Sequence, residues 1–255
     1  MESFAAENKN ILHSVDTALQ LMDLLEQNSH LSLTEISRAL SIGKSTAFRL
    51  CYTLERRGYI LRREDGSYGL GIRLLCLGTV AKDRMEIVHF LRPLLMRLNR
   101  KTDETIHLVV WADSYRVVLV DEILGSGSIR VVSDVKAPRY AHETSTGMTL
   151  LAAKPDEYIQ EYLRVVPLKR KTPKAYGHPD QILAAIDQIR RQGYSLNDQL
   201  YEVGLMSIAV PVYNSAHSVV GAISISGLDT RLRPRLDEFL AALRSTAAEA
   251  AELPF

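Results

Sequence analysis

The stretch that decides the fold of the N-terminal part is SLTEISRALSIGKSTAFRLCYTLERRGYI, residues 32–60. Ser32 and Glu35 have the spacing of a capping box, and apolar residues follow at helical spacing, so a helix is expected to begin at this point. The turn Ser41-Ile42-Gly43 separates this helix from a second one. Two short amphipathic helices joined by a three-residue turn that contains glycine predict a helix-turn-helix.

The second of these helices is expected to span residues 44–57 and to end at Gly58. Short strands at 59–61 and 68–70 flank an Asp65-Gly66 turn, which is typical of a hairpin. A hairpin directly after the second helix is where the wing of a winged helix-turn-helix belongs. The apolar face of the helix is expected to consist of Ala47, Leu50, Cys51 and Leu54.

The opposite face of the 44–57 helix carries residue types that suit the major groove of DNA. Arginine can contact guanine in bidentate fashion, and serine or threonine can contact base edges or phosphates. Because the N-terminal part of a recognition helix meets the bases, we expect base contacts from Ser45, Thr46 and Arg49. Phosphate contacts are expected from Lys44, Tyr52, Arg56 and the wing residues Arg62 and Arg63.

Local charge supports this interpretation. Residues 30–75 hold eight Lys or Arg and four Asp or Glu, a net charge of +4, whereas the whole chain has a formal net charge of +1. Phosphate neutralisation requires such a local excess of positive charge. The alternative is a small helical bundle with a solvated basic face, but the turn, the capping box and the wing together favour DNA binding.

Composition excludes several classes of protein. The chain has 255 residues, of which 46% are hydrophobic and 24% charged, the balance of a globular protein. It has no apolar run long enough for a membrane span, and its first residues lack the pattern of a secretion signal, so a cytoplasmic location is expected. Cys51 and Cys76 have no metal-ligand spacing, and no cofactor is expected.

The pattern changes near residue 84, where strand-like and helical segments begin to alternate. It predicts an α+β protein with three parts: a winged helix-turn-helix over 1–71, a linker helix over 72–84 and a sensor domain with an antiparallel sheet over 85–255. Strands are expected at 105–111, 117–120, 128–132, 207–213 and 219–226. Helices are expected at 14–27, 85–100, 147–153, 155–164, 179–192 and 234–252.

From Ser14 to about Ala248 the chain resembles the IclR family of transcription regulators. The N-terminal part of the resemblance lies in LTEISRAL, GKSTAFRLCYTLERRGYI and YGLGIRLLCLG, and the C-terminal part in YEVGLMSIAVPVYN followed by VVGAISISG. The resemblance implies a winged helix-turn-helix, a linker helix and a GAF-like effector domain. It also implies a homodimer or a dimer of dimers that responds to a small organic acid, aromatic acids included. Repressors and activators both occur in the family, and we expect a repressor.

The resemblance also implies an effector site. Carried across position by position, its residues are Ser145, Thr146, Asn197, Leu205, Ser207, Ser224 and Ser226. The first two open a helix whose N-terminus favours an anion, and the last two share one face of a strand. Many relatives have cysteine where Ser207 stands and an acid where Asn197 stands, so ligand identity transfers less well than the fold. Arg130 and His107 are further candidates.

Two other functional classes stay open on the residues alone. The first is a catalytic or ligand-binding GAF-like protein without operator-specific regulation, although no GxSxG, phosphate loop or HExxH motif supports catalysis. The second is a ligand-binding module that acts through protein partners. His107, His142 and His178 could meet in space around a metal, but their spacing gives no positive indication of one. We therefore expect no catalytic residues, no metal and no membrane partner, and a double-stranded DNA operator as the target.

Overall fold

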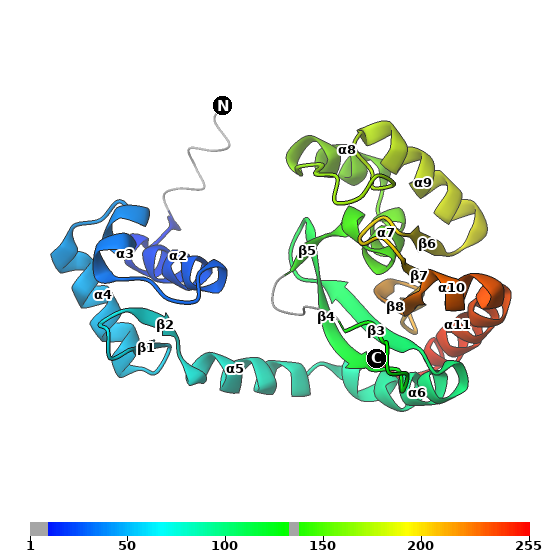
Figure 1. Ribbon diagram of the computed structural model, residues 1–255, viewed down its shortest axis with the longest axis horizontal. Helices are drawn as coiled ribbons and strands as arrows, with labels where there is room; N and C mark the ends of the chain where they lie inside the picture. The colour runs from blue at the N-terminus through cyan, green and yellow to red at the C-terminus, as the bar shows by residue number, and fades with distance from the viewer. Residues whose placement is uncertain (1–9, 133–137) are drawn as a thin grey trace. The chain divides into compact units, whose positions relative to one another are not determined.

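The computed structural model describes residues 10–132 and 138–255, and it divides into two compact units between Lys82 and Asp83 (Figure 1). The first unit contains α2 (His13–Gln27), α3 (Leu33–Ala39), α4 (Lys44–Arg56), β1 (Ile60–Arg62), β2 (Tyr68–Leu70) and most of α5 (Ile72–Asp83). In this unit the predicted helix-turn-helix and its hairpin both form. None of the helices in the described ranges is long and apolar enough to cross a membrane.

Local chemistry sets the bounds of the helix-turn-helix. The Ser32 hydroxyl accepts from the Glu35 backbone N–H at 3.3 Å, and the Glu35 carboxylate accepts from the Ser32 backbone N–H at 2.7 Å. The Ser32 hydroxyl also donates to the Glu35 carboxylate at 2.7 Å. This bond and the one from the Ser32 backbone N–H lower the pKa of Glu35, because they stabilise its ionised form. The Ser37 hydroxyl donates to the Ile42 carbonyl and holds the turn. Helix α4 ends before Gly58, whose φ of +75° lies in the left-handed region that favours glycine.

The core of the first unit is small and comes from every element except α5. It consists of the buried residues Leu21, Leu25, Ile36, Ala47, Cys51, Ile60 and Tyr68. Burial raises the pKa of Cys51 to about 11, so this thiol stays neutral at physiological pH. Helix α5, by contrast, has no buried residue and exposes several apolar side chains.

The second unit is built on a six-stranded antiparallel sheet of order β5-β4-β3-β8-β7-β6. Its strands are β3 (Thr105–Trp111), β4 (Arg116–Ile123), β5 (Arg139–Tyr140), β6 (Ser195–Asp198), β7 (Leu205–Tyr213) and β8 (Val219–Leu228). Its helices are α6 (Glu86–Thr102), α7 (Ser145–Ala152), α8 (Asp156–Val165), α9 (Pro179–Gln192), α10 (Asp229–Leu232) and α11 (Leu236–Ala250), with 3-10 turns at Ala141–Glu143 and Arg233–Arg235. The predicted α+β class is confirmed.

Two hydrophobic cores lie on opposite faces of this sheet. Helices α6 and α11 pack on one face against residues such as Leu108 and Ile223, and α7, α8 and α9 cover the other face (Figure 1). Because side chains alternate along a strand, Ile223 and Ile225 of β8 enter the first core. Ser224 and Ser226 therefore point to the opposite face, the side of α7.

Three details differ from the sequence-based prediction. The strand expected at 128–132 does not form. The segment is held instead through the Thr105 hydroxyl, which donates to the Val131 carbonyl at 2.8 Å. Strands β5 and β6 were not predicted, since both are short and polar. The last helix begins at Leu236 rather than at 234, after a 3-10 turn.

Candidate functional site

The outward face of α4 presents the predicted DNA-contacting residues to solvent. Lys44, Ser45, Thr46, Arg49, Tyr52 and Arg56 are all exposed, whereas Ala47 and Cys51 on the opposite side are buried. Arg49 and Arg56 thus lie on the accessible side of the helix, where their guanidinium groups are available to a ligand. This arrangement suits insertion into a major groove.

The wing carries the other two predicted residues. Arg62 and Arg63 are exposed, and the Arg62 guanidinium lies 5.9 Å from the centre of the Tyr68 ring. The hairpin turn is fixed by Asp65, which accepts from the Ser67 hydroxyl at 2.6 Å and from the Ser67 backbone N–H at 2.9 Å. These bonds lower the pKa of Asp65. The wing therefore presents two cations on a turn that is held by its own side chains.

Sequence reasoning missed Phe48 on the same helix. Its side chain is 49% exposed, and its ring stacks on that of Tyr52, with the ring centres 6.3 Å apart. It was not part of the predicted apolar face, and its apolar side chain did not mark it as a DNA contact. The signal was its helical angle, since Phe48 is rotated by about 100° from the buried Ala47.

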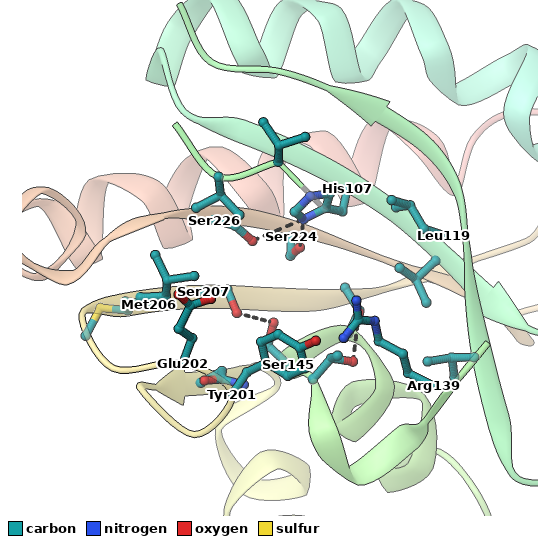
Figure 2. Close-up of a pocket in the computed structure, with 18 residues that line it drawn as sticks. His107, Leu119, Arg139, Ser145, Tyr201, Glu202, Met206, Ser207, Ser224 and Ser226 are labelled. Carbon is teal, nitrogen blue, oxygen red and sulfur yellow. Dashed lines mark hydrogen bonds between the residues drawn. The ribbon is translucent and has the colours of Figure 1, made fainter. Parts of the chain in front are cut away.

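In the second unit, a cavity of about 270 Å³ opens between the sheet and the N-terminus of α7 (Figure 2). All seven residues that the resemblance named as an effector site line this one cavity. They come from α7, β6, β7 and β8, which are far apart in the sequence. The other polar or charged lining residues are His107, Arg139, Thr144, Tyr201 and Glu202, and the apolar ones are Val109, Val117, Leu119, Val131, Val132 and Met206.

The α7 side of the cavity is built around two serines. The Ser145 and Ser207 hydroxyl oxygens lie 2.7 Å apart and join the helix to strand β7 (Figure 2). Thr144 caps the helix, because its hydroxyl accepts from the Gly147 backbone N–H at 3.0 Å. A Cβ atom at Gly147 would lie 2.2 Å from the Ala141 carbonyl oxygen, so only glycine allows the helix to begin at this place. The unpaired N–H groups of its first turn favour an anion.

The sheet side of the cavity is built around His107. Its Nδ1 lies 3.1 Å from the Ser226 hydroxyl and 3.5 Å from the Ser224 hydroxyl (Figure 2). Its Nε2 lies 3.1 Å from a Glu122 carboxylate oxygen, so a carboxylate orients the ring. The imidazole therefore connects the two serines of β8 to an acid on β4, and it forms part of the cavity wall.

Asn197 shapes the loop that follows β6. Its Oδ1 accepts from the Leu200 backbone N–H at 2.9 Å, and its Nδ2 donates to the Glu143 carbonyl at 3.4 Å. The loop carries Tyr201 and Glu202 into the cavity wall. In this structure the Asn197 amide thus positions other lining residues, and Leu205 adds apolar surface beside it.

Sequence reasoning also missed Arg139 and Tyr201. The Arg139 guanidinium lies 4.6 Å from the centre of the Tyr201 ring, and both residues line the cavity. No periodic pattern marks either residue in the sequence, so only the folded chain reveals them. The alternative arginine candidate, Arg130, is exposed and lies outside the cavity lining.

The three histidines considered as a metal site have separate environments. His107 lines the cavity, His142 is buried against Tyr162, and His178 precedes α9, where its backbone N–H donates to Gln181. Within residues 10–132 and 138–255, no group of three or more His, Cys, Asp or Glu side chains is placed to hold a metal ion.

Comparison with known proteins agrees with this architecture. Residues 14–64 match the model of the IclR helix-turn-helix domain, and residues 79–251 match that of the bacterial transcriptional regulator IclR C-terminal domain. The chain is 32% identical over 224 residues to the HTH-type transcriptional regulator XynR of Escherichia coli, covering 87% of this chain and 88% of XynR.

Two solved structures extend the comparison. The Thermotoga maritima IclR is 28% identical, with a TM-score of 0.70 over 94% of this chain and 98% of that one. An IclR homologue from Microbacterium hydrocarbonoxydans, solved with 4-hydroxybenzoate, shares the fold with a TM-score of 0.76 at 22% identity, over 94% of this chain and 97% of that one.

Proposed function

The chain belongs to the IclR family of bacterial transcriptional regulators, and from this premise we propose that it represses transcription at a specific operator under the control of a small organic acid. The observation that carries the proposal is the pairing of two features in one chain. One is an exposed basic face on α4, and the other is a cavity lined by all seven expected effector residues.

The DNA-binding part of the proposal rests on α4 and the wing. Ser45, Thr46 and Arg49 contact base edges, and Lys44, Tyr52, Arg56, Arg62 and Arg63 contact phosphates. One such module binds DNA weakly, so the regulator acts as a homodimer whose recognition helices lie about 34 Å apart, one turn of DNA. A dimer of dimers would occupy two such sites. The regulator acts in the cytoplasm, where its operator lies.

The effector part rests on the chemistry of the cavity. A carboxylate sits at the N-terminus of α7, where backbone N–H groups and the Ser145 and Ser207 hydroxyls can donate to its oxygens. The apolar residues Val109, Val117 and Leu119 then face the carbon skeleton of the acid. The volume of about 270 Å³ and the related structure with 4-hydroxybenzoate both support a small acid, aromatic acids included.

The regulatory step is a coupling between the two binding events. An acid that binds one conformational state of the protein better than another shifts the population toward that state. Repression is relieved if that state binds the operator more weakly. By thermodynamic linkage, the operator then weakens acid binding by the same factor.

The test begins with selection of an operator from random DNA by the full chain. Fluorescence anisotropy then measures affinity for that operator and for random DNA at increasing salt, and a thermal-shift screen of small organic acids finds the effector. We expect operator affinity to fall steeply with salt, with a log–log slope of about −0.9 for each phosphate contact. We also expect the acid to lower operator affinity.

A matched pair of variants assigns the effect to the cavity. Ser207→Ala removes a cavity hydroxyl and should reduce the response to the acid, while Ser215→Ala, in the exposed β7–β8 turn, should leave it unchanged. Operator affinity that is indifferent to a saturating acid would overturn the regulatory proposal. It would favour a ligand-binding or catalytic protein without operator-specific regulation.

A further inference from the structure

Phe48 is a large, exposed apolar side chain at the edge of the basic face of α4. We propose that its ring reads the C5 methyl group of a thymine in the major groove and so helps to specify the operator. This inference rests on the DNA-binding function proposed above, and it assigns to one residue a role in sequence specificity.

The position of Phe48 on the helix places it among the expected base-contacting residues. It lies three residues after Ser45, and at about 100° per residue the two differ by only about 60° in direction. Arg49 is the next residue, and both lie in the N-terminal half of α4, the part of a recognition helix that meets base edges. By the same measure the buried residues Ala47 and Cys51 lie about 100° and 60° from Phe48, so the ring lies between the buried side of the helix and Ser45.

The conformation of the ring suits a contact rather than a place in the core. Phe48 stays 49% exposed, and its ring plane is inclined by only 22° to that of Tyr52, with the ring centres 6.3 Å apart. Stacking on Tyr52 restricts the ring, so less side-chain entropy is lost when it meets DNA. An apolar side chain held at the groove-facing surface matches the one apolar group on the major-groove edge of the base pairs, the thymine methyl.

The positive charge near Phe48 favours DNA over another protein as the ligand of this part of α4. The exposed cations nearest to Phe48 along α4 are Lys44, one turn before it, and Arg49, the next residue, and the unit that carries them has the local surplus of positive charge. The acidic residue of α4, Glu55, lies about two turns away, beyond the N-terminal half of the helix. DNA has phosphates that can pair with the cations and thymine methyl groups that can contact the apolar ring.

The test uses thymine-to-deoxyuridine substitution, which removes the methyl group and keeps base pairing. An operator selected with the full chain is synthesised with each thymine replaced singly, and its affinity for the wild-type protein and for Phe48→Ala is measured. We expect wild-type affinity to fall about fourfold at one thymine in each half-site, because burying one methyl-sized group contributes about 0.8 kcal/mol. We expect Phe48→Ala to bind the thymine and deoxyuridine operators equally.

Controls separate this role from folding and from self-association. Phe48→Leu should retain part of the methyl effect, and Val165→Ala, an exposed apolar truncation at the end of α8, should retain all of it. Circular dichroism and sedimentation show whether each variant folds and assembles as the wild type does. An operator that shows no methyl effect with the wild type, or the same effect with Phe48→Ala, overturns the inference alone.

Two further outcomes would also show that the inference about Phe48 is wrong. If Phe48→Ala weakens both operators equally and changes the sedimentation coefficient, the ring lies between copies of the chain and the inference is wrong. If selection yields no preferred sequence at all, the proposed regulatory function fails, and the role of Phe48 fails with it.

Discussion

The hydroxyl oxygens of Ser145 and Ser207 lie 2.7 Å apart, although the residues are 62 positions apart in the chain. One opens helix α7 and the other belongs to strand β7. A pair of serines has two hydroxyl protons, and their mutual bond uses one of them. The other proton is left available to donate to a ligand beside the N-terminus of α7.

Removing one of these hydroxyls should weaken binding of the organic acid. In Ser207→Ala, Ser145 loses its partner and the cavity loses a donor, while the change in volume is small. A hydrogen bond to a charged group contributes about 1.5–3 kcal/mol, so we expect the dissociation constant to rise by roughly 10- to 100-fold. Isothermal titration calorimetry with the acid found by screening measures it.

Cysteine at the same position tests the chemistry of the donor. Ser207→Cys keeps a weaker donor on a larger atom, so its affinity should fall between that of the wild type and that of Ser207→Ala. Ser215→Ala, outside the cavity, should bind as the wild type does. Equal affinity in all four proteins would show that the acid does not contact this serine pair.

Two arginines of the first unit should differ in what they contribute to DNA binding. Arg49→Ala should reduce discrimination between operator and random DNA by about 1–3 kcal/mol, because its side chain contacts a base edge. Arg63→Ala, in the wing, should weaken both DNAs alike and reduce the salt slope by about 1. Anisotropy titrations on both DNAs at several salt concentrations measure these effects. Equal loss for Arg49→Ala on the two DNAs would place Arg49 on a phosphate instead.

Gly147 should tolerate no side chain. Its Cβ would meet the Ala141 carbonyl oxygen at 2.2 Å, and both are backbone positions that cannot rotate away. We expect Gly147→Ala to lower the free energy of unfolding of the second unit by about 1–3 kcal/mol, the cost of overpacking, and to weaken acid binding because the start of α7 is displaced. Urea unfolding monitored by the fluorescence of Trp111, the single tryptophan, measures the first effect.

The control for this substitution lies in another helix. A Cβ at Gly78, inside α5, would have nothing within 4 Å, and alanine is the better helix former. Gly78→Ala should therefore be neutral or slightly stabilising in thermal unfolding. A Gly147→Ala protein as stable as the wild type would mean that the contact with Ala141 relaxes without cost.

Elements specified by local chemistry could be predicted from the sequence. The Ser32–Glu35 capping box begins α3, Gly58 ends α4, and the alternation in β8 sends Ser224 and Ser226 to one face. Each of these depends on residues within a few positions of one another, so the pattern is visible in the linear chain. The residues around the cavity were predicted through family resemblance, because no local pattern brings Ser145 to Ser207.

What the sequence did not reveal depends on contacts between distant segments. Segment 128–132 has the composition of a strand, yet it is held by side chains of distant residues: Thr105 donates to the Val131 carbonyl and Arg231 to the Ile129 carbonyl. Arg139 lines the cavity with its guanidinium over the ring of Tyr201, 62 residues further on. Phe48 lay outside the predicted apolar face of α4, and only the structure shows that its ring is exposed and stacked on Tyr52.

The free energy of unfolding should decrease as the pH is lowered, because a histidine is buried among the helices of the second unit. His142 is 5% exposed, and its Nδ1 lies 2.7 Å from the Tyr162 hydroxyl oxygen, with which it shares a hydrogen bond. Within the described chain, Nε2 has no hydrogen-bond partner. Burial lowers the pKa of His142 below its ordinary value of 6.5, because the charged ring would lose its hydration.

The sign of the effect follows from proton uptake. Above about pH 6.5 His142 is neutral in the folded and unfolded chains, so it adds no pH dependence. As the pH falls through 6.5, the unfolded chain takes up a proton that the folded chain does not, and unfolding becomes easier by up to about 1.4 kcal/mol per pH unit. The loss ends at the lowered pKa of the folded state.

His142→Asn isolates this contribution, since its side-chain amide can still form a hydrogen bond with Tyr162 but cannot titrate. Urea unfolding followed by Trp111 fluorescence, at a series of pH values between 7.5 and 5, should show a shallower loss of stability in the variant than in the wild type. His89→Asn, on the exposed side of α6, should keep the wild-type slope. Parallel curves for wild type and His142→Asn would mean that the folded protein protonates His142 as readily as the unfolded chain does, and that its burial carries no cost.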